Sequence, residues 1–326
     1  MFSILNIKHV FLIGSASNIS TVYKTIQDQG LKPIVVTSPD QESEIKGKCS
    51  YSVFSKLDDS FYSFVLDSCE PANTLFVSLG ARWIFNKDTI KLMNSNLVNF
   101  HGSRLPFDAG GGGFSWRILK RDRIDNQLVH MVDEGIDTGS IIATTTSVFP
   151  SNCTIPKDFE KFHRDKFEIF FKSFLIDLKK GVKFPLMNQV DYIGCYNPRL
   201  KTDINGWINW AWDGEHIVDF INAFDDPYNG ASTIINKEIV KLKKCQLHGG
   251  EQNTHPFSTG IISRKHEGFI VVSTGGRYSI IIESIINEKG FNIINELKAG
   301  DRFYTRAKDI HESITTRVNF GPNGHM

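Results

Sequence analysis

The chain has 326 residues, of which 40% are hydrophobic and 22% are charged, and its formal net charge at pH 7 is +1. This length fits two domains of ordinary size, and the near-neutral charge disfavours a protein that grips nucleic acid by its phosphates. The five cysteines are far apart and form no C-x-x-C pair, so they provide neither a disulfide framework nor a metal site. The sequence shows no leader peptide and no apolar run of about 18 residues. It predicts a cytoplasmic protein without a membrane segment.

The first third of the chain predicts alternating strands and helices. An apolar run that ends at Gly14 is typical of a buried parallel strand, and Ser20 is the expected N-cap of the helix that follows. This order predicts a parallel α/β sheet. The loop after the first strand lacks G-x-G-x-x-G, which argues against a dinucleotide site. The expected strands cover residues 9–13, 33–37, 74–79 and 97–101, and the expected helices cover residues 20–29, 58–68 and 87–93.

A run of four glycines, Gly110 to Gly113, interrupts the pattern after the fourth strand. Such a run either lets a ligand or another loop approach closely or forms a mobile loop. The helix expected at 114–120 contains Trp116, which either joins the core or walls a site. Two further strands, at 127–132 and 140–147, flank an acidic loop.

A long helix is expected from Thr154, its N-cap, to Lys180, with Pro156 in its first turn. Its phenylalanines recur at helical spacing and belong to the core, and His163 among them is expected to be a structural histidine. After Pro185, short β-type runs separated by glycine predict a small barrel. The predicted domains are residues 1–187 and 188–326. The tail from residue 319 is expected to be disordered or a cloning remnant.

Polar side chains at the end of the fourth strand indicate chemistry. Residues two apart in a strand share a face, so Asn99 and His101 point the same way. An amide and an imidazole together can stabilise an oxyanion and move a proton, and Asp137 is the carboxylate that would orient His101. Ordinary roles as turn formers or surface residues are open for all three. The sequence contains no G-x-S-x-G elbow and no Cys beside a His, so it predicts no protein nucleophile.

The two polar segments together resemble a known signature. N-x-H-x-S-x-L-P at 99–106 and D-x-G-x-D-T-G at 133–139 are similar to motifs of the folate-dependent formyltransferases. That family includes methionyl-tRNA formyltransferase, glycinamide ribonucleotide formyltransferase and the nucleotide-sugar N-formyltransferases. The likeness runs from about residue 75 to 303. It implies an α/β fold, with a Rossmann-like formyltransferase domain and a smaller, mostly β C-terminal domain resembling an OB barrel.

The resemblance also implies roles for individual residues. Asn99, His101 and Asp137 would be catalytic, with His101 as the base toward the acceptor amine. The formyl donor would be N10-formyltetrahydrofolate, and no metal is implied. The implied donor-binding residues are Gly80, Ala81, Arg82, Trp83, Ile84, Asp133, Glu134, Gly135 and Ile136.

The chain departs from the family's pattern just after the first motif. Arg104 stands where the family usually has leucine, and Phe107-Asp108-Ala109-Gly110 lacks the usual basic residue followed by glycine. In the second domain, Asn222 stands where an arginine is common. These changes leave the formyl chemistry untouched and concern the acceptor. The candidate acceptor-binding residues are Ser103, Arg104, Gly111 and Gly112.

The expected acceptor is the amino group of a nucleotide-linked amino sugar used in bacterial surface polysaccharide (O-antigen) biosynthesis. Its base would stack on Trp83, Trp116 or a member of the tryptophan cluster at 207–212. One alternative is methionyl-tRNA formyltransferase, which predicts a basic stripe for tRNA. Another is a non-catalytic ligand-binding module of the same fold, which the three retained polar residues disfavour. A homodimer formed through the C-terminal domain is left open.

Overall fold

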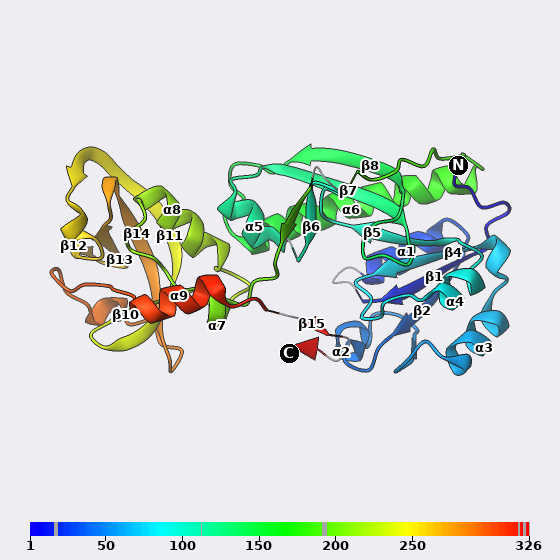
Figure 1. The fold of residues 1–326 in the computed structure, drawn as a ribbon, viewed down its shortest axis with the longest axis horizontal. Coiled ribbons are helices and arrows are strands. Elements are labelled where there is room, and N and C mark those ends of the chain that lie inside the picture. The colour runs from blue at the N-terminus through cyan, green and yellow to red at the C-terminus, as the bar shows by residue number, and fades with distance from the viewer. Residues whose placement is uncertain (16–18, 112, 191–193, 319, 322–323, 326) are drawn as a thin grey trace.

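The structure is a computed structural model that describes residues 1–15, 19–111, 113–190, 194–318, 320–321 and 324–325. Figure 1 shows two lobes side by side, one that contains the N-terminus and is built on a large sheet, and one rich in β-strands. Within the described residues, no helix has both the length and the apolar character needed to cross a membrane.

A seven-stranded sheet organises the N-terminal lobe, in the order β3-β2-β1-β4-β5-β7-β8. The neighbours from β3 to β5 pair in parallel, whereas β5–β7 and β7–β8 pair antiparallel. The expected parallel sheet is therefore mixed, because the short loop between β7 and β8 can only join antiparallel neighbours. The strands are β1 (His9–Gly14), β2 (Lys32–Thr37), β3 (Ser52–Val53), β4 (Thr74–Leu79), β5 (Leu97–His101), β7 (Ile124–Met131) and β8 (Ile141–Val148).

Helices cover both faces of this sheet because the strand side chains alternate. In β1, Val10 and Leu12 join the core with α1 and α6, whereas Phe11 and Ile13 join the core with α3. Strands buried on both faces explain the continuous apolar runs of the sequence. The helices of this lobe are α1 (Ile19–Asp28), α2 (Glu42–Ile45), α3 (Asp59–Ser68), α4 (Lys87–Leu92), α5 (Gly113–Leu119) and α6 (Pro156–Lys179).

Two expected N-caps are wrong. Helix α1 begins at Ile19, so Ser20 lies inside it. Helix α6 follows Ile155, and the Asp158 carboxylate accepts the backbone N–H groups of Thr154 and Ile155, with N–O distances of 3.1 and 3.3 Å. An acid in the first turn that reaches back accepts from the backbone N–H of the N-cap residue, whereas a capping hydroxyl would accept from N–H groups within the first turn.

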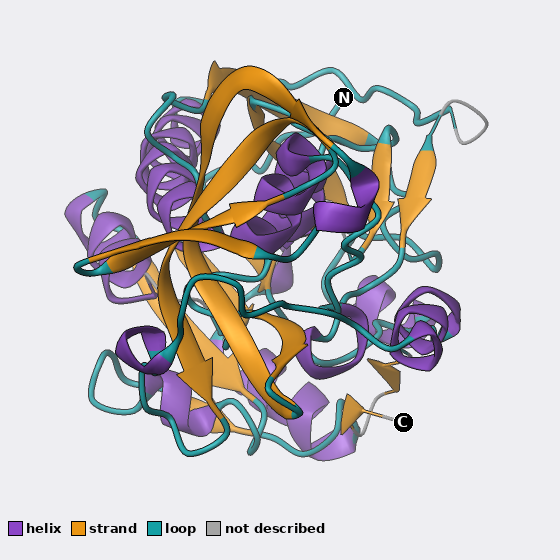
Figure 2. Cartoon of the chain, turned by 90° about the vertical axis from the view of Figure 1, so that its left-hand side faces the viewer, coloured by secondary structure: helices purple, strands orange, loops and turns teal. Residues whose placement is uncertain are grey.

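The β-rich lobe is a five-stranded antiparallel sheet in the order β10-β11-β14-β13-β12. A later segment pairs with both ends of this order, Tyr304 with Ile234 and Arg302 with Ile261, and curls the sheet into a barrel (Figure 2). The smaller, mostly β domain is confirmed. Its strands are β10 (Ala231–Ile235), β11 (Glu238–Thr254), β12 (Ile262–His266), β13 (Phe269–Ser273) and β14 (Gly276–Asn287), and its helices are α7 (Thr202–Asn205), α8 (Gly214–Ala223) and α9 (Ala307–Thr315).

Helix α5 joins the two lobes, as Figure 1 shows. Its Ser115 hydroxyl donates to the carbonyl of Ala223 at the end of α8, at 2.7 Å. Just beyond the helix, Arg121 donates to Asp219 of α8, with an N–O distance of 2.6 Å. The chain itself crosses between the lobes after α6, and we call residues 180–190 and 194–201 the connecting segment. The proposed domain boundary after residue 187 falls in it.

The glycine run brings the connecting segment close. Strand β6 (Asp108–Gly110) pairs in parallel with β9 (Cys195–Asn197). A Cβ on Gly111 would lie 2.7 Å from the Cβ of Arg199, closer than side chains tolerate. Another chain segment therefore occupies the space that the glycines leave open. Gly112 lies outside the described residues, as does part of the predicted tail, whose described parts form β15 (Phe320–Gly321) and β16 (Gly324–His325).

Candidate active site

Strand β5 delivers the candidate catalytic pair because its two faces differ. Phe100 points toward α6, where four phenylalanine rings surround it with centroid distances of 5.2 to 5.9 Å. Alternation along the strand turns Asn99 and His101 to the opposite face. Both side chains are half-buried at the point where β5 ends.

A second histidine, His130 on β7, completes the site. It lies opposite Asn99 in the antiparallel register of β5 and β7, with its Nε2 3.1 Å from the Asn99 amide nitrogen. Its Nδ1 is 2.8 Å from the carbonyl oxygen of Met131, so Nδ1 carries the proton and Nε2 accepts from Asn99. The sequence analysis missed His130, because its register with β5 is the signal that places it.

Asp137 lies between the two imidazoles. Its Oδ1 is 3.8 Å from His101 Nδ1 and 3.8 Å from His130 Nε2. The acidic loop thus brings the three predicted catalytic side chains, Asn99, His101 and Asp137, into one cluster. At 3.8 Å the carboxylate acts on His101 through its charge rather than through a short hydrogen bond.

Burial sets the protonation state of the histidines. It lowers the pKa of His101 from 6.5, and the Asp137 carboxylate offsets this shift only in part. Burial also lowers the pKa of His130. Both rings are therefore neutral at neutral pH. His101 Nε2 is buried without a hydrogen-bond partner among the described residues, so no described protein group uses its lone pair or proton.

The loop that carries Asp137 is folded by its own side chains. The Asp133 carboxylate accepts from the N–H of Gly135 at 3.1 Å and from the hydroxyl of Thr138 at 2.6 Å. From the connecting segment, the Gln189 amide donates to the carbonyls of Asp137 and Gly139 at 2.8 and 2.7 Å. Gln189 holds the loop, and no sequence motif marks it.

A cavity of about 380 Å³ opens beside the cluster, and we call it the donor-side cavity. It contains every predicted donor-binding residue except Glu134, which forms a surface ion pair with Lys87 at 3.6 Å. The predicted residues that line it are Gly80, Ala81, Arg82, Trp83, Ile84, Asp133, Gly135 and Ile136, together with Asn99, His101 and Asp137.

A second cavity of about 640 Å³, the acceptor-side cavity, shares Ile136 and Asp137 with the first. Its other wall carries Tyr196, Arg199 and Arg317. The sequence analysis singled out none of these three as an acceptor residue, because they come from segments far along the chain.

The predicted acceptor-binding residues are only partly at this cavity. Gly111 lines it, but Ser103 and Arg104 are not among its lining residues. Arg104 instead lies 3.5 Å from Asp108 and 3.9 Å from Asp122, and its guanidinium lies over the ring of Phe107. Gly112 is outside the part of the chain that the structure describes.

The site also has the composition of a metal site. His101, His130 and Asp137 offer three ligand atoms within 4.8 Å of one another, a set that divalent cations accept. The Asn99 amide, however, already uses the Nε2 lone pair of His130 that a metal would need. The arrangement therefore suits proton transfer and oxyanion stabilisation better than it suits a metal ion.

Comparison with known proteins identifies the family. The formyl transferase C-terminal domain matches residues 201–295, within the β-rich lobe. A methionyl-tRNA formyltransferase of Geotalea daltonii is 27% identical over 248 residues, which cover 74% of this chain and 75% of that protein. The chain belongs to the formyltransferase family. It is a folate-dependent formyltransferase, and the predicted family is confirmed.

Solved structures share the fold of this formyltransferase. One is the N-formyltransferase from Helicobacter canadensis in complex with folinic acid and dTDP-3-aminofucose. It has a TM-score of 0.64 at 19% identity over 85% of this chain and 99% of that one. Another is WlaRD, a sugar 3N-formyl transferase solved with dTDP and 5-N-formyl-THF, with a TM-score of 0.60 at 19% identity over 88% and 99%. At this identity the likeness establishes the formyltransferase fold.

Proposed function

We propose that this formyltransferase moves the formyl group of N10-formyltetrahydrofolate to the amino group of a nucleotide-linked amino sugar. The observation that carries the proposal is the meeting of two cavities at Asp137 and Ile136. The donor-side cavity has a wall of backbone and Trp83 suited to a flat pterin. The acceptor-side cavity carries Arg199 and Arg317, which suit an acceptor with phosphate groups.

The named ligands of the structural relatives support both halves of the proposal. The Helicobacter canadensis enzyme was solved with a formylated folate and a dTDP-linked amino sugar, and WlaRD with a formylated folate and dTDP. The two ligand types correspond in number and character to the two cavities that meet at Asp137. Surface polysaccharide biosynthesis would use the product, an N-formamido sugar that still carries its nucleotide.

The geometry supports a sequence of steps for formyl transfer. The amine nitrogen of the acceptor attacks the formyl carbon, and the carbonyl oxygen becomes an oxyanion that the second N–H of Asn99 stabilises. Neutral His101 takes the proton that the amine loses. The bond from the formyl carbon to N10 then breaks, and the proton passes to N10 as tetrahydrofolate leaves. Asp137 stabilises the imidazolium while it carries the proton.

Methionyl-tRNA formyltransferase is the second candidate, because the Geotalea daltonii relative has that name. The net charge of +1 disfavours it, since a tRNA ligand is held mainly by neutralised phosphates. Both candidates use the same donor and the same cluster, so only the acceptor distinguishes them.

The experiment incubates the protein with N10-formyltetrahydrofolate and a panel of UDP-, dTDP- and GDP-linked amino sugars. Mass spectrometry should detect the addition of one formyl group to at least one sugar. Formylation of methionyl-tRNA but of no sugar would establish the second candidate instead. Absence of both activities, with no binding of the folate, would favour the non-catalytic module.

The His101→Ala variant tests the assignment of the base. Removal of the imidazole should lower kcat by about 10²- to 10⁴-fold, while circular dichroism shows an unchanged fold. The Asp309→Asn variant, on α9 and outside both cavities, is the control. Turnover by His101→Ala that equals the control would contradict the mechanism.

A further inference from the structure

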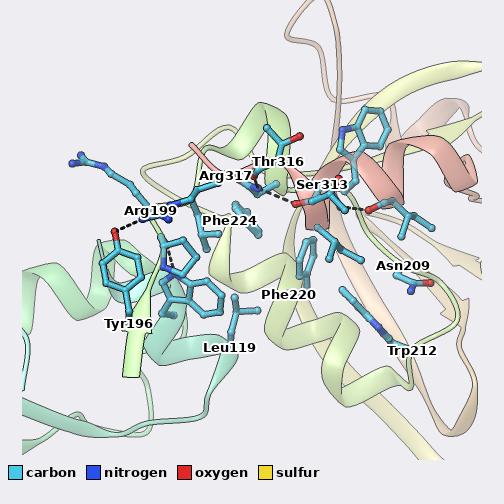
Figure 3. A pocket seen from close by; sticks show the side chains of 18 residues that line it. Leu119, Tyr196, Arg199, Asn209, Trp212, Phe220, Phe224, Ser313, Thr316 and Arg317 are labelled. Carbon is cyan, nitrogen blue, oxygen red and sulfur yellow. Dashed lines mark hydrogen bonds between the residues drawn. The ribbon is translucent and has the colours of Figure 1, made fainter. Parts of the chain in front are cut away.

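A third cavity, of about 390 Å³, lies where the two lobes meet (Figure 3). Its walls come from α5, the connecting segment, α8 and the end of α9. We call it the aromatic pocket because, besides Tyr196, five of its side chains are aromatic and lie outside the catalytic cluster. These side chains are Trp116, Trp207, Trp212, Phe220 and Phe224.

Specific contacts hold the walls of the aromatic pocket. The Trp116 indole donates to the carbonyl of Pro198 at 2.7 Å. The Trp212 ring packs edge-on against Phe220, with centroids 5.1 Å apart. The Asn205 amide donates to the carbonyls of Ser313 and Thr316, at the end of α9, at 2.9 and 3.2 Å. The pocket is therefore formed in the free protein, which is the usual state of a small-molecule site.

The aromatic pocket adjoins the acceptor-side cavity. Tyr196, Arg199 and Arg317 line both of them. Arg317 is held at this junction, since its guanidinium lies 5.2 Å from the centre of the Tyr196 ring and donates to the Tyr196 hydroxyl at 3.3 Å (Figure 3). Asp137 and the two arginines therefore line one cavity, and the same arginines line the aromatic pocket beside it.

We propose that the aromatic pocket binds the nucleobase of a nucleoside diphosphate whose sugar reaches His101. This inference rests on the proposed function, and it adds where the nucleotide lies. From Asp137 into the aromatic pocket, the lining side chains are first catalytic, then cationic and then aromatic. This order matches the order of amino sugar, diphosphate and base in a nucleotide sugar. Arginine pairs with phosphate oxygens, and aromatic side chains stack on bases.

The positions of the tryptophans also distinguish among the residues that the sequence offered for stacking on the base. Trp83 lines the donor-side cavity, so it is assigned to the folate. Trp116, Trp207 and Trp212 line the aromatic pocket, so the base-stacking role falls to this cluster. An apolar pocket alone would fit many ligands, but its junction with two arginines and a catalytic site restricts the occupant to an anionic one with a flat apolar end.

The experiment measures binding of UDP, dTDP and GDP, each alone, to the full chain by isothermal titration calorimetry. Two variants alter the proposed nucleotide site. Thr315→Trp places an indole in the aromatic pocket from the exposed end of α9, and Arg317→Gln removes a cation at the junction. Arg264→Gln, on the exposed face of β12 and outside all three cavities, is the matched control.

At least one of the three nucleotides should bind, and the dissociation constant should rise about tenfold or more in both pocket variants, with no change in Arg264→Gln. Lack of binding by all three nucleotides, or binding that both pocket variants leave unchanged, would overturn the inference.

Formylation assays separate this result from the proposed function. Formylation of a nucleotide sugar with the KM unchanged in both pocket variants would preserve the function and refute the location of the base. Nucleotide binding that Thr315→Trp and Arg317→Gln both weaken, without formylation of any sugar, would support the pocket and refute the proposed acceptor.

Discussion

Hydrogen bonds to neighbouring groups orient the single residues of the cluster. His130 donates from Nδ1 to the Met131 carbonyl and accepts at Nε2 from Asn99. One N–H of the Asn99 amide is thereby used by His130. This hydrogen bond fixes the orientation of the amide, and with it the direction of its second N–H. His130 acts through Asn99 and is a positioning residue in the proposed reaction, whereas His101 would touch the reacting amine.

Exchange of His130 tests this positioning role. His130→Phe cannot accept from Asn99, whereas His130→Gln keeps a side-chain oxygen that can. We expect the Phe variant to lose about 10- to 100-fold in kcat, because an oxyanion donor that is not oriented stabilises less. The Gln variant should retain more of the rate, with KM for the donor similar in both. Equal kcat values in the two variants would show that the hydrogen bond to Asn99 is unimportant.

The titration of His101 gives a second prediction. Because burial lowers its pKa from 6.5 and Asp137 offsets part of that shift, the ring should titrate below pH 6.5. Removal of the carboxylate by Asp137→Asn should lower the pKa further, since the charge favours the protonated ring. NMR of 13C-histidine-labelled protein measures both midpoints, with the His101→Ala spectrum assigning the signal. A midpoint above 6.5 in the wild type would contradict the assignment.

The same shift has a defined effect on stability. Between pH 6.5 and the lower native pKa, the unfolded chain binds more protons at His101 than the folded chain. The free energy of unfolding therefore decreases as the pH falls through this window, and His101 contributes no pH dependence above it.

Among the elements, helix α5 links the β-rich lobe to the turn that follows the catalytic strand. Its buried Arg117 donates to the carbonyl of Gly102 at 3.0 Å and also to that of Ile124. His163 of α6 lies against the other side of Gly102 and forms a 2.6 Å contact with the buried Asp125, as expected of a structural histidine. The turn after His101 is thus held by two helices.

Arg117→Met tests the role of α5. Loss of the guanidinium leaves the Gly102 carbonyl without its charged donor, at a cost of about 1.5–3 kcal/mol in stability. We expect a lower Tm and a kcat reduced about tenfold, with KM for the folate donor little changed. Lys120→Met, one residue beyond the end of α5 and paired with Asp108 at 3.3 Å near the surface, should change neither value. An unchanged kcat in Arg117→Met would limit the residue to a structural role.

At the scale of the whole molecule, the glycine run lets the connecting segment close over the N-terminal lobe. This contact brings Tyr196 and Arg199 to the acceptor-side cavity. A Cβ on Gly111 would lie 2.8 Å from the Cα of Arg199, whereas a Cβ on Gly113 would meet nothing within 4 Å. Gly111 and Gly113 can therefore be compared directly, since one is closely packed and the other is not.

Gly111→Ala should destabilise the protein by about 1–3 kcal/mol, because the added methyl displaces the connecting segment. Gly113→Ala, at the start of α5, should be neutral or stabilising by up to about 1 kcal/mol, since alanine favours a helix. Thermal unfolding measures both changes. If nucleotide binding depends on Arg199, the Gly111 variant should weaken it and the Gly113 variant should not. Equal Tm values for the two variants would contradict the close packing.

The sequence determined the features that depend on neighbouring residues. Strand β4 covers the predicted residues 74–79, because a buried strand needs only a continuous apolar run closed by a breaker. The shared face of Asn99 and His101 follows from the two-residue period of a strand. The two motifs, one around Asn99 and His101 and one around Asp137, together supplied the family, and with it the fold class and the formyl chemistry.

Only the tertiary structure decided which distant residues meet. His130 reaches Asn99 through antiparallel register, and Gln189 reaches the Asp137 loop from the connecting segment. Arg317 reaches Tyr196 across 121 positions of sequence. Such contacts depend on the packing of whole lobes, whose relative position no short window of sequence encodes. The walls of the acceptor-side cavity come largely from such distant segments, whereas the candidate catalytic pair, Asn99 and His101, lies on one strand.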